Sequence, residues 1–246
     1  MKDDPEQAKG LLRKAADNGC TASMVLLGDI LIDGNDDEKA EAISLFTRAY
    51  EAGNNMGSRN LGYCYALGMG VEYSKEKAAE WYRISAEDGN ARAQCNLGVL
   101  YAYGHGVELD YAKAAEWYRR SAENGYSRGR TNYACLLRDG KGVERDPEKA
   151  VYWFEQSDSP RAKRLLAQMY LGGNGIQKDV DKARELLESA SEKDRKAMFL
   201  LGDLIYDEDR DRAISLYKRS AEKGYDEAIS RLTELSLEVP PKKTRK

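Results

Sequence analysis

Several features are scarce in this chain of 246 residues, and each scarcity excludes a class of function. A single histidine, His105, rules out mechanisms that need two imidazoles. No apolar run approaches the roughly 18 residues of a membrane span, and the stretch from Met1 to Glu6 lacks the apolar core of a secretory signal. The 39 basic and 42 acidic residues give a net charge of −3, which argues against a dedicated nucleic-acid binder. We therefore expect a cytoplasmic protein with no membrane partner.

Internal repetition accounts for most of the length. Residues 76–89 read EKAAEWYRISAEDG, and residues 112–125 read AKAAEWYRRSAENG, 36 positions later. Weaker copies emerge when the chain is aligned on one recurring alanine: Ala8, Ala42, Ala78, Ala114, Ala150, Ala183 and Ala213. A small residue that directly follows an apolar one also recurs along the chain, in step with these alanines: Gly28, Gly62, Gly98, Ala134, Ala167 and Gly202. Gly-x-Gly turns recur as well, at Gly68/Gly70, Gly104/Gly106, Gly140/Gly142 and Gly173/Gly175.

Each repeat is predicted to form two helices. The first, over 91–103 in the clearest copy, places apolar residues four apart on one face and ends at Gly104, which can adopt a left-handed conformation. Asp110 is a suitable N-cap for the second helix, which ends at Gly125. Ser74, Asp146 and Asp179 occupy the same capping position in other copies. The turn glycines repeat in register with the helices, which argues against a coiled coil or a bundle of unrelated helices.

The repeat resembles the Sel1-like repeats, which are related to the tetratricopeptide repeats. The residues that carry the resemblance are Ala93-x3-Leu97-Gly98-x2-Tyr101-x2-Gly104-x-Gly106-Val107-x2-Asp110-x2-Lys113-Ala114-x2-Trp117-Tyr118-x3-Ala122-x2-Gly125. The resemblance covers about residues 5–237 and implies an all-α fold, a right-handed α-solenoid of helix–turn–helix repeats.

We expect a single solenoid domain over 1–238. It consists of a half repeat (4–19), six repeats (about 20–53, 54–89, 90–125, 126–158, 159–194 and 195–224) and a second half repeat (225–238). The half repeats either cap the solenoid or mark the chain as a segment of a longer protein. Residues 239–246 form a basic tail, either a flexible terminus or a short address peptide.

No catalytic, cofactor or metal site is expected. His105 lies inside a Gly-x-Gly turn where other copies carry Met69, Lys141 and Asn174, as is typical of a solvent-facing loop position. The four cysteines occupy four different repeat positions, without the regular pairs that the resemblance implies for secreted, cysteine-rich relatives. The pairs Trp81/Tyr82, Trp117/Tyr118 and Trp153/Phe154 are predicted to form core between repeats.

The candidate binding surface follows from the resemblance, which implies that first helices line a concave side. An asparagine recurs two positions before the small residue, and an arginine or lysine recurs six positions before it. Carboxamides can pair with a peptide backbone of any sequence, and arginine offers a fork for carboxylates. The predicted partner-binding residues are Arg59, Asn60, Tyr63, Arg92, Asn96, Tyr103, Arg128, Asn132, Arg161, Arg164 and Gln168. Two alternatives stay open: the asparagines join neighbouring helices, or the arginines pair with nearby glutamates on a solvated edge.

These residues predict a non-enzymatic scaffold or adaptor that binds a protein or peptide in its groove. Its partner would be acidic or would present a free C-terminal carboxylate. Two other functions remain as alternatives: a hydrolase of the β-lactamase-like, cysteine-rich type, and an RNA-binding solenoid that uses the arginines and the basic tail. Neither the oligomeric state nor the partner follows from the sequence, and the basic tail would be compatible with a nuclear location in a eukaryote.

Overall fold

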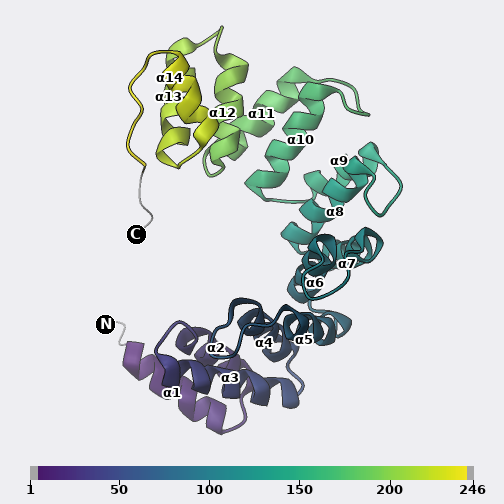
Figure 1. The fold of residues 1–246 in the computed structure, drawn as a ribbon, viewed down its shortest axis with the longest axis vertical. Coiled ribbons are helices and arrows are strands. Elements are labelled where there is room, and N and C mark those ends of the chain that lie inside the picture. Colours follow the sequence, from purple (N-terminus) through teal and green to yellow (C-terminus); the bar gives the residue numbers. More distant parts are fainter. Residues whose placement is uncertain (1–4, 243–246) are drawn as a thin grey trace. The chain divides into compact units, whose positions relative to one another are not determined.

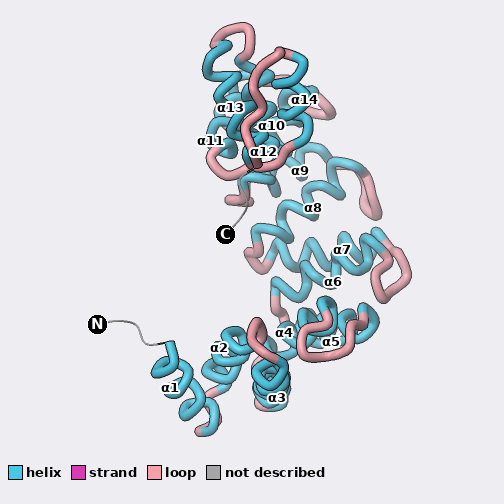
Figure 2. The backbone as a smooth tube through the Cα atoms, turned by 60° about the vertical axis from the view of Figure 1, so that its left-hand side comes forward, coloured by secondary structure: helices cyan, strands magenta, loops and turns pink. Residues whose placement is uncertain are grey.

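The computed structural model describes residues 5–242, and that part of the chain contains fourteen α-helices and no strand (Figures 1 and 2). The predicted all-α fold is therefore confirmed. The helices are α1 (Pro5–Asp17), α2 (Thr21–Leu31), α3 (Asp36–Glu51), α4 (Asn55–Leu67), α5 (Lys75–Glu87), α6 (Ala91–Tyr103), α7 (Tyr111–Glu123), α8 (Ser127–Asp139), α9 (Pro147–Glu155), α10 (Pro160–Gly172), α11 (Val180–Ser191), α12 (Arg195–Ile205), α13 (Arg210–Glu222) and α14 (Asp226–Glu234).

The helices fall into two compact units. Unit 1 ends at Gly129 and also contains Lys141–Glu144. Unit 2 contains Arg130–Gly140 and the residues from Arg145 onward. The organisation as a single domain stays a prediction.

The local signals in the sequence fold as expected. Helix α6 spans the predicted 91–103, and Gly104 follows it with φ of 64°, a conformation that glycine adopts without a Cβ penalty. The Asp110 carboxylate accepts a hydrogen bond from the backbone N–H of Lys113 at 2.9 Å and so caps α7. Ser74, Asp146 and Asp179 cap α5, α9 and α11 in the same way.

Small residues bring the helices close together. The recurring alanines from Ala42 to Ala213 are fully buried, whereas Ala8 is exposed and departs from the pattern. At Gly98, a Cβ atom would lie 2.7 Å from two ring carbons of Tyr118, so only a glycine leaves room for that ring. The same approach occurs between Gly202 and Tyr217 in unit 2.

The aromatic pairs only partly match their predicted role. Tyr82, Tyr118 and Phe154 are buried, as expected of a core between helices. Their tryptophan neighbours, Trp81, Trp117 and Trp153, are only half-buried. The reason is helical geometry, because adjacent positions point about 100° apart and only one of the two can face the core fully.

A buried serine joins the two helices of a repeat, a feature not predicted from the sequence. The Ser121 hydroxyl of α7 donates to the carbonyl oxygen of Ala91, the first residue of α6, at 2.6 Å. Ser85 of α5 and Ser220 of α13 make the same bond to the first residues of α4 and α12. All three serines are completely buried, so each bond satisfies groups that water cannot reach.

Parts of the predicted ends lie outside the described residues. This applies to Asp4 of the first half repeat and to residues 243–246 of the basic tail. The described part of the tail, 239–242, follows α14 without regular secondary structure, and Lys242 Nζ lies 3.4 Å from Asp226 Oδ1.

Candidate functional site

Exposed apolar side chains concentrate on the even-numbered helices of unit 1. Six large apolar side chains there are 39–66% exposed: Leu26, Ile30, Met56, Tyr63, Leu67 and Tyr103. The structure shows no exposed side chain of this kind on α3, α5 or α7. We call the surface formed by α2, α4 and α6 the even-helix face of unit 1 (Figure 1). Outside this face, unit 1 exposes Leu11 on α1 and Tyr73 and Leu109 in loops. A concentration of apolar side chains left in solvent on one face is typical of an interaction surface.

Helical periodicity places these side chains on one face. Leu26 and Ile30 are four residues apart on α2, and Tyr63 and Leu67 are four apart on α4. Side chains at this spacing lie one above the other along a helix. The face therefore carries short apolar rows, which suit a partner's alternating apolar side chains.

A pocket of about 290 Å³ opens on this face beside α2 and α4. Its lining includes Asp29, Arg59, Asn60 and Tyr63. The buried Asn60 amide donates to Asp29 Oδ1 at 2.7 Å and so joins two neighbouring repeats. Burial raises the pKa of Asp29, and the Arg59 charge and the Asn60 hydrogen bond oppose that rise. The contact supports the interpretation of Asn60 as a residue that joins neighbouring helices.

The other two predicted asparagines also bond within the protein. Asn96 hydrogen-bonds to the side chain of Tyr82 in unit 1. In unit 2, Asn132 Oδ1 accepts a hydrogen bond from Arg161 Nη1 at 3.1 Å. The asparagines thus contact neighbouring helices rather than forming an unoccupied row of amides.

Arg59 and Arg92 lie together in unit 1. They line a second pocket, of about 390 Å³, whose wall also includes Met56 and Tyr126. Arg59 is half-buried, and its Nε atom is buried without a hydrogen-bond partner in the described chain. Burial lowers the pKa of Arg59, which the charge of Asp29 partly offsets. Arg92 is exposed, and its guanidinium lies 6.0 Å from the centre of the Tyr126 ring.

The remaining unit 1 residues predicted to bind a partner are exposed. Arg128 projects from the first turn of α8. Tyr103, at the end of α6, is 66% exposed, and its ring stacks on His105 at 5.7 Å. His105 is half-buried by this contact, so the prediction of an ordinary exposed loop histidine is only partly right.

In unit 2, both predicted arginines have partners within the protein, Arg161 at an exposed position and Arg164 at a shielded one. Arg164 Nε donates to Asp194 Oδ2 at 3.0 Å, and the two side chains are only 12% and 14% exposed. Arg164 Nη1 also donates to Gln168 Oε1 at 3.3 Å. A shielded ion pair of this kind holds α10 against the start of α12, and it leaves little charge for a partner.

Seven segments of the chain match a family model described as the Sel1 repeat: 1–20, 21–54, 56–90, 91–126, 127–157, 160–194 and 196–225. Together these segments cover most of the chain. The chain is a Sel1 repeat protein. Sel1 repeats are commonly protein–protein interaction modules.

Solved structures share the fold of this Sel1 repeat protein. A protective antigen of uropathogenic Escherichia coli strains, described as displaying an SLR fold, is 29% identical with a TM-score of 0.80, and the match covers 96% of this chain and 53% of the antigen. A Sel1 repeat protein from Oxalobacter formigenes is 28% identical with a TM-score of 0.78, and that match covers 86% of this chain and 89% of the other. Both structures support the solenoid of helical repeats.

One curated relative is the rat protein named DAP3-binding cell death enhancer 1. It is 34% identical over 85 residues, which are 34% of this chain and 17% of the rat protein. The Sel1 repeat protein thus spans about half of the E. coli antigen and a smaller share of the rat relative.

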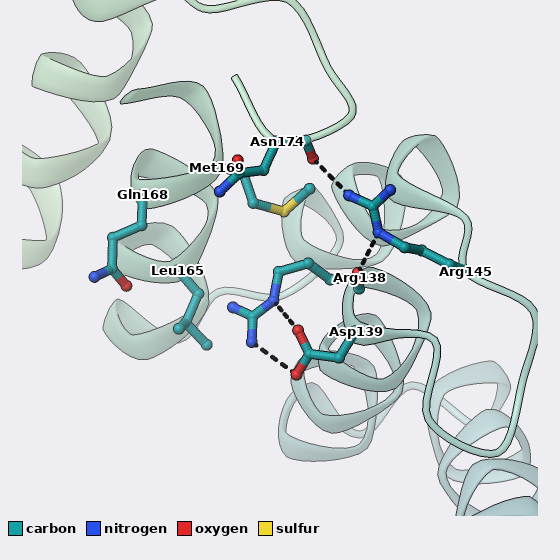
Figure 3. Close-up of a pocket in the computed structure, with 7 residues that line it drawn as sticks. All are labelled: Arg138, Asp139, Arg145, Leu165, Gln168, Met169 and Asn174. Carbon is teal, nitrogen blue, oxygen red and sulfur yellow. Dashed lines mark hydrogen bonds and ion pairs between the residues drawn. The ribbon is translucent and has the colours of Figure 1, made fainter. Parts of the chain in front are cut away.

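Sequence reasoning missed a polar pocket of about 370 Å³ in unit 2 of this Sel1 repeat protein (Figure 3). Arg138 binds Asp139 through two hydrogen bonds of 2.7 and 3.1 Å. Arg145 donates to the carbonyl oxygens of Arg138 at 3.1 Å and Asn174 at 3.4 Å. The two cations of this pocket are therefore engaged by acceptors of the protein itself. Arg138 and Asp139 are adjacent in the sequence, and Gln168 of the pocket is among the predicted binding residues, but the alignment of repeats gives no sign that Arg145 meets Asn174 there.

Two features of the described residues concern metal binding and the reactivity of a pocket thiol. Residues 5–242 contain no group of three histidine, cysteine, aspartate or glutamate side chains that could hold a metal ion. Burial raises the pKa of the Cys64 thiol to about 12, so this pocket cysteine is protonated at neutral pH and is a poor nucleophile.

Within residues 5–242, no helix is both long enough and apolar enough to cross a bilayer.

Proposed function

We propose that this Sel1 repeat protein is a non-enzymatic scaffold that binds a segment of a partner protein across the even-helix face of unit 1. The observation that carries the proposal is the segregation of exposed apolar side chains onto α2, α4 and α6, while α3, α5 and α7 carry none among the described residues. A solvent-exposed apolar surface of this kind is stabilised when a partner covers it.

Arginines on the same side of the unit indicate the character of the segment. Arg59 and Arg92 place positive charge beside Met56 and Tyr63 of this face, and exposed Tyr63 and Tyr103 add aromatic contact area with a polar tip. Arg128 adds a further exposed charge in unit 1. An acidic segment with apolar side chains complements this surface. The name of the rat relative, which describes it as binding another protein, supports a protein partner for this chain as well.

We assign only part of the predicted set to binding. Tyr63, Tyr103, Arg59, Arg92 and Arg128 are kept as contacts for the partner. The asparagines are assigned to contacts between repeats, and Arg164 and Gln168 to packing in unit 2, because each has a partner within the protein.

Site-specific cross-linking tests this proposal. A photoreactive benzoylphenylalanine replaces Tyr63 in one variant and Tyr152 in a control, since Tyr152 is 54% exposed on α9 in unit 2 and Tyr63 is 45% exposed on α4. After illumination in cells, we expect a discrete cross-linked protein from position 63 and none of that mass from position 152. Equal cross-linking at both positions, or RNA in place of protein at position 63, would overturn the proposal.

A further inference from the structure

Arg59 and Arg92 line two neighbouring pockets, and one of the two has no carboxylate in its lining. We call this one the two-arginine pocket; it lies at α4, α6 and the loop before α8, with a volume of about 390 Å³. Its lining is Met56, Arg59, Asn90, Ala91, Arg92, Asn124, Gly125 and Tyr126. Two guanidinium groups line it without a carboxylate, whereas the neighbouring pocket on the same face contains Asp29 and Asp33.

Arg59 has unused hydrogen-bonding capacity in this pocket. Its buried Nε atom has no acceptor among the described residues. Asp29 influences Arg59 electrostatically, but the structure shows no ion pair between them, and Asp29 Oδ1 is occupied by Asn60 at 2.7 Å. A buried donor without an acceptor costs free energy, and a ligand recovers it if the Arg59 side chain turns its Nε–H towards the pocket.

The two asparagines of the pocket are engaged within the protein. Asn90 Oδ1 accepts hydrogen bonds from the backbone of Arg92 and Ala93, as the cap of α6. Asn124 Nδ2 donates to Gln94 Oε1 at 3.0 Å. The guanidinium groups are therefore the donors that the pocket offers to a ligand, and their planar forks match a carboxylate.

We propose that the two-arginine pocket holds the carboxylate of a glutamate side chain in the bound segment, an inference that rests on the proposed function. Met56 and the Tyr126 ring provide apolar wall for the methylene groups that carry the carboxylate. Arg59 and Arg92 then select an acidic residue at one position of the bound segment. The apolar rows on α2 and α4 contact other side chains of that segment.

A side-chain carboxylate fits better than the carboxylate at a chain end. A terminal carboxylate is commonly captured by a nest of free backbone N–H groups. Here the backbone N–H groups of Asn90, Gly125 and Tyr126 donate to Ser85, Ala122 and Ser121 carbonyls, each at 3.0 Å. They are unavailable to a ligand, so recognition depends on the guanidinium groups.

Nuclear magnetic resonance on the full chain tests the assignment through the arginine Nε–H signals. Three small compounds are titrated: N-acetylglutamate N-methylamide, its glutamine analogue, and N-acetylalanine, which carries only a terminal carboxylate. We expect saturable shifts of the Arg59 and Arg92 signals with the glutamate compound, and about tenfold weaker binding of the glutamine analogue, because it lacks the charge-assisted hydrogen bonds. Equal binding of the glutamate and glutamine compounds overturns the proposal, and tighter binding of N-acetylalanine overturns the assignment to a side chain.

Matched variants separate this site from a general charge effect. Arg92→Gln and Arg83→Gln each remove one positive charge from unit 1, but Arg83 is exposed on α5, away from the pocket. We expect Arg92→Gln to abolish the saturable shift of Arg59, and Arg83→Gln to leave it unchanged, with the same circular dichroism for both variants. An equal loss in both variants overturns the site.

The two proposals fail in different ways. If the glutamate compound saturates the pocket while position 63 cross-links nothing, the binding of a partner across the face fails and the carboxylate site stands. If position 63 cross-links a protein and the arginine signals do not respond, only the carboxylate site is overturned.

Discussion

Arg59 is a residue whose charge the described protein leaves without an ion pair. Its guanidinium is half-buried, its Nε atom has no hydrogen bond, and burial lowers its pKa. A sequence selected for stability alone would place an apolar side chain at such a position. Residues that lower the stability of the free protein in this way tend to lie at functional sites, because a bound ligand supplies the missing interaction.

Arg59→Met tests this conflict between stability and binding. Methionine keeps a long, flexible stem and removes the buried charge, so we expect the free energy of unfolding to rise by about 1 kcal/mol. Urea denaturation measures the change. The variant should at the same time lose the binding of N-acetylglutamate N-methylamide. Arg83→Met, at an exposed position, should change stability by less than about 0.5 kcal/mol. A less stable Arg59→Met variant would show that Arg59 serves the fold.

At the scale of elements, helices pack closely where small residues recur. Gly98 of α6 faces the Tyr118 ring of α7 so closely that any added Cβ atom would overlap it. Gly10, in α1, has no atom within 4 Å of such a Cβ. A Cβ atom therefore has space at Gly10 but would overlap a neighbouring side chain at Gly98.

We predict that the two substitutions change stability with opposite signs. Gly98→Ala should destabilise the protein by about 1–3 kcal/mol, because the overlap forces α6 and α7 apart. Gly10→Ala should stabilise it by about 0.5–1 kcal/mol, because alanine favours the helix and meets no obstacle. Thermal unfolding followed by circular dichroism checks both changes. A neutral Gly98→Ala variant would contradict the close packing.

The serine that joins the two helices of a repeat makes a second prediction about elements. Ser121→Ala leaves the buried carbonyl of Ala91 without its 2.6 Å hydrogen bond, and we expect a loss of about 1–3 kcal/mol. Ser44→Ala, at an exposed position on α3, is the matched control and should be nearly neutral. Denaturant titration of both variants measures the difference. Equal, small effects would show that the bond contributes little.

For the whole molecule, the sequence predicts the fold better than the binding surface. The bounds of α6, the Asp110 cap and the left-handed Gly104 follow from signals within a few residues, and these repeat along the chain. The pairing of Arg164 with Asp194 joins residues 30 positions apart, and periodicity alone does not show which cation meets which acid. Arg59 and Arg164 occupy the same repeat position, three residues before the small residue, so the sequence does not distinguish them. The structure separates Arg59, with its unpaired Nε, from the ion-paired Arg164.

The dependence of each repeat on its neighbours leads to a prediction for the whole chain. In a solenoid, stability is approximately a sum of repeat terms and nearest-neighbour interfaces, so damage at one interface stays local. Gly98→Ala should accelerate hydrogen exchange in α6 and α7. The exchange rate should rise about tenfold for each 1.4 kcal/mol of lost local stability. Exchange in α12 and α13, which belong to unit 2, should change by less than about twofold if neighbour interfaces dominate. Mass spectrometry of peptic peptides measures both regions in one experiment. Equal acceleration throughout residues 5–242 would instead identify a single cooperative folding unit, in which a methyl group at Gly98 weakens even the helices that never contact it.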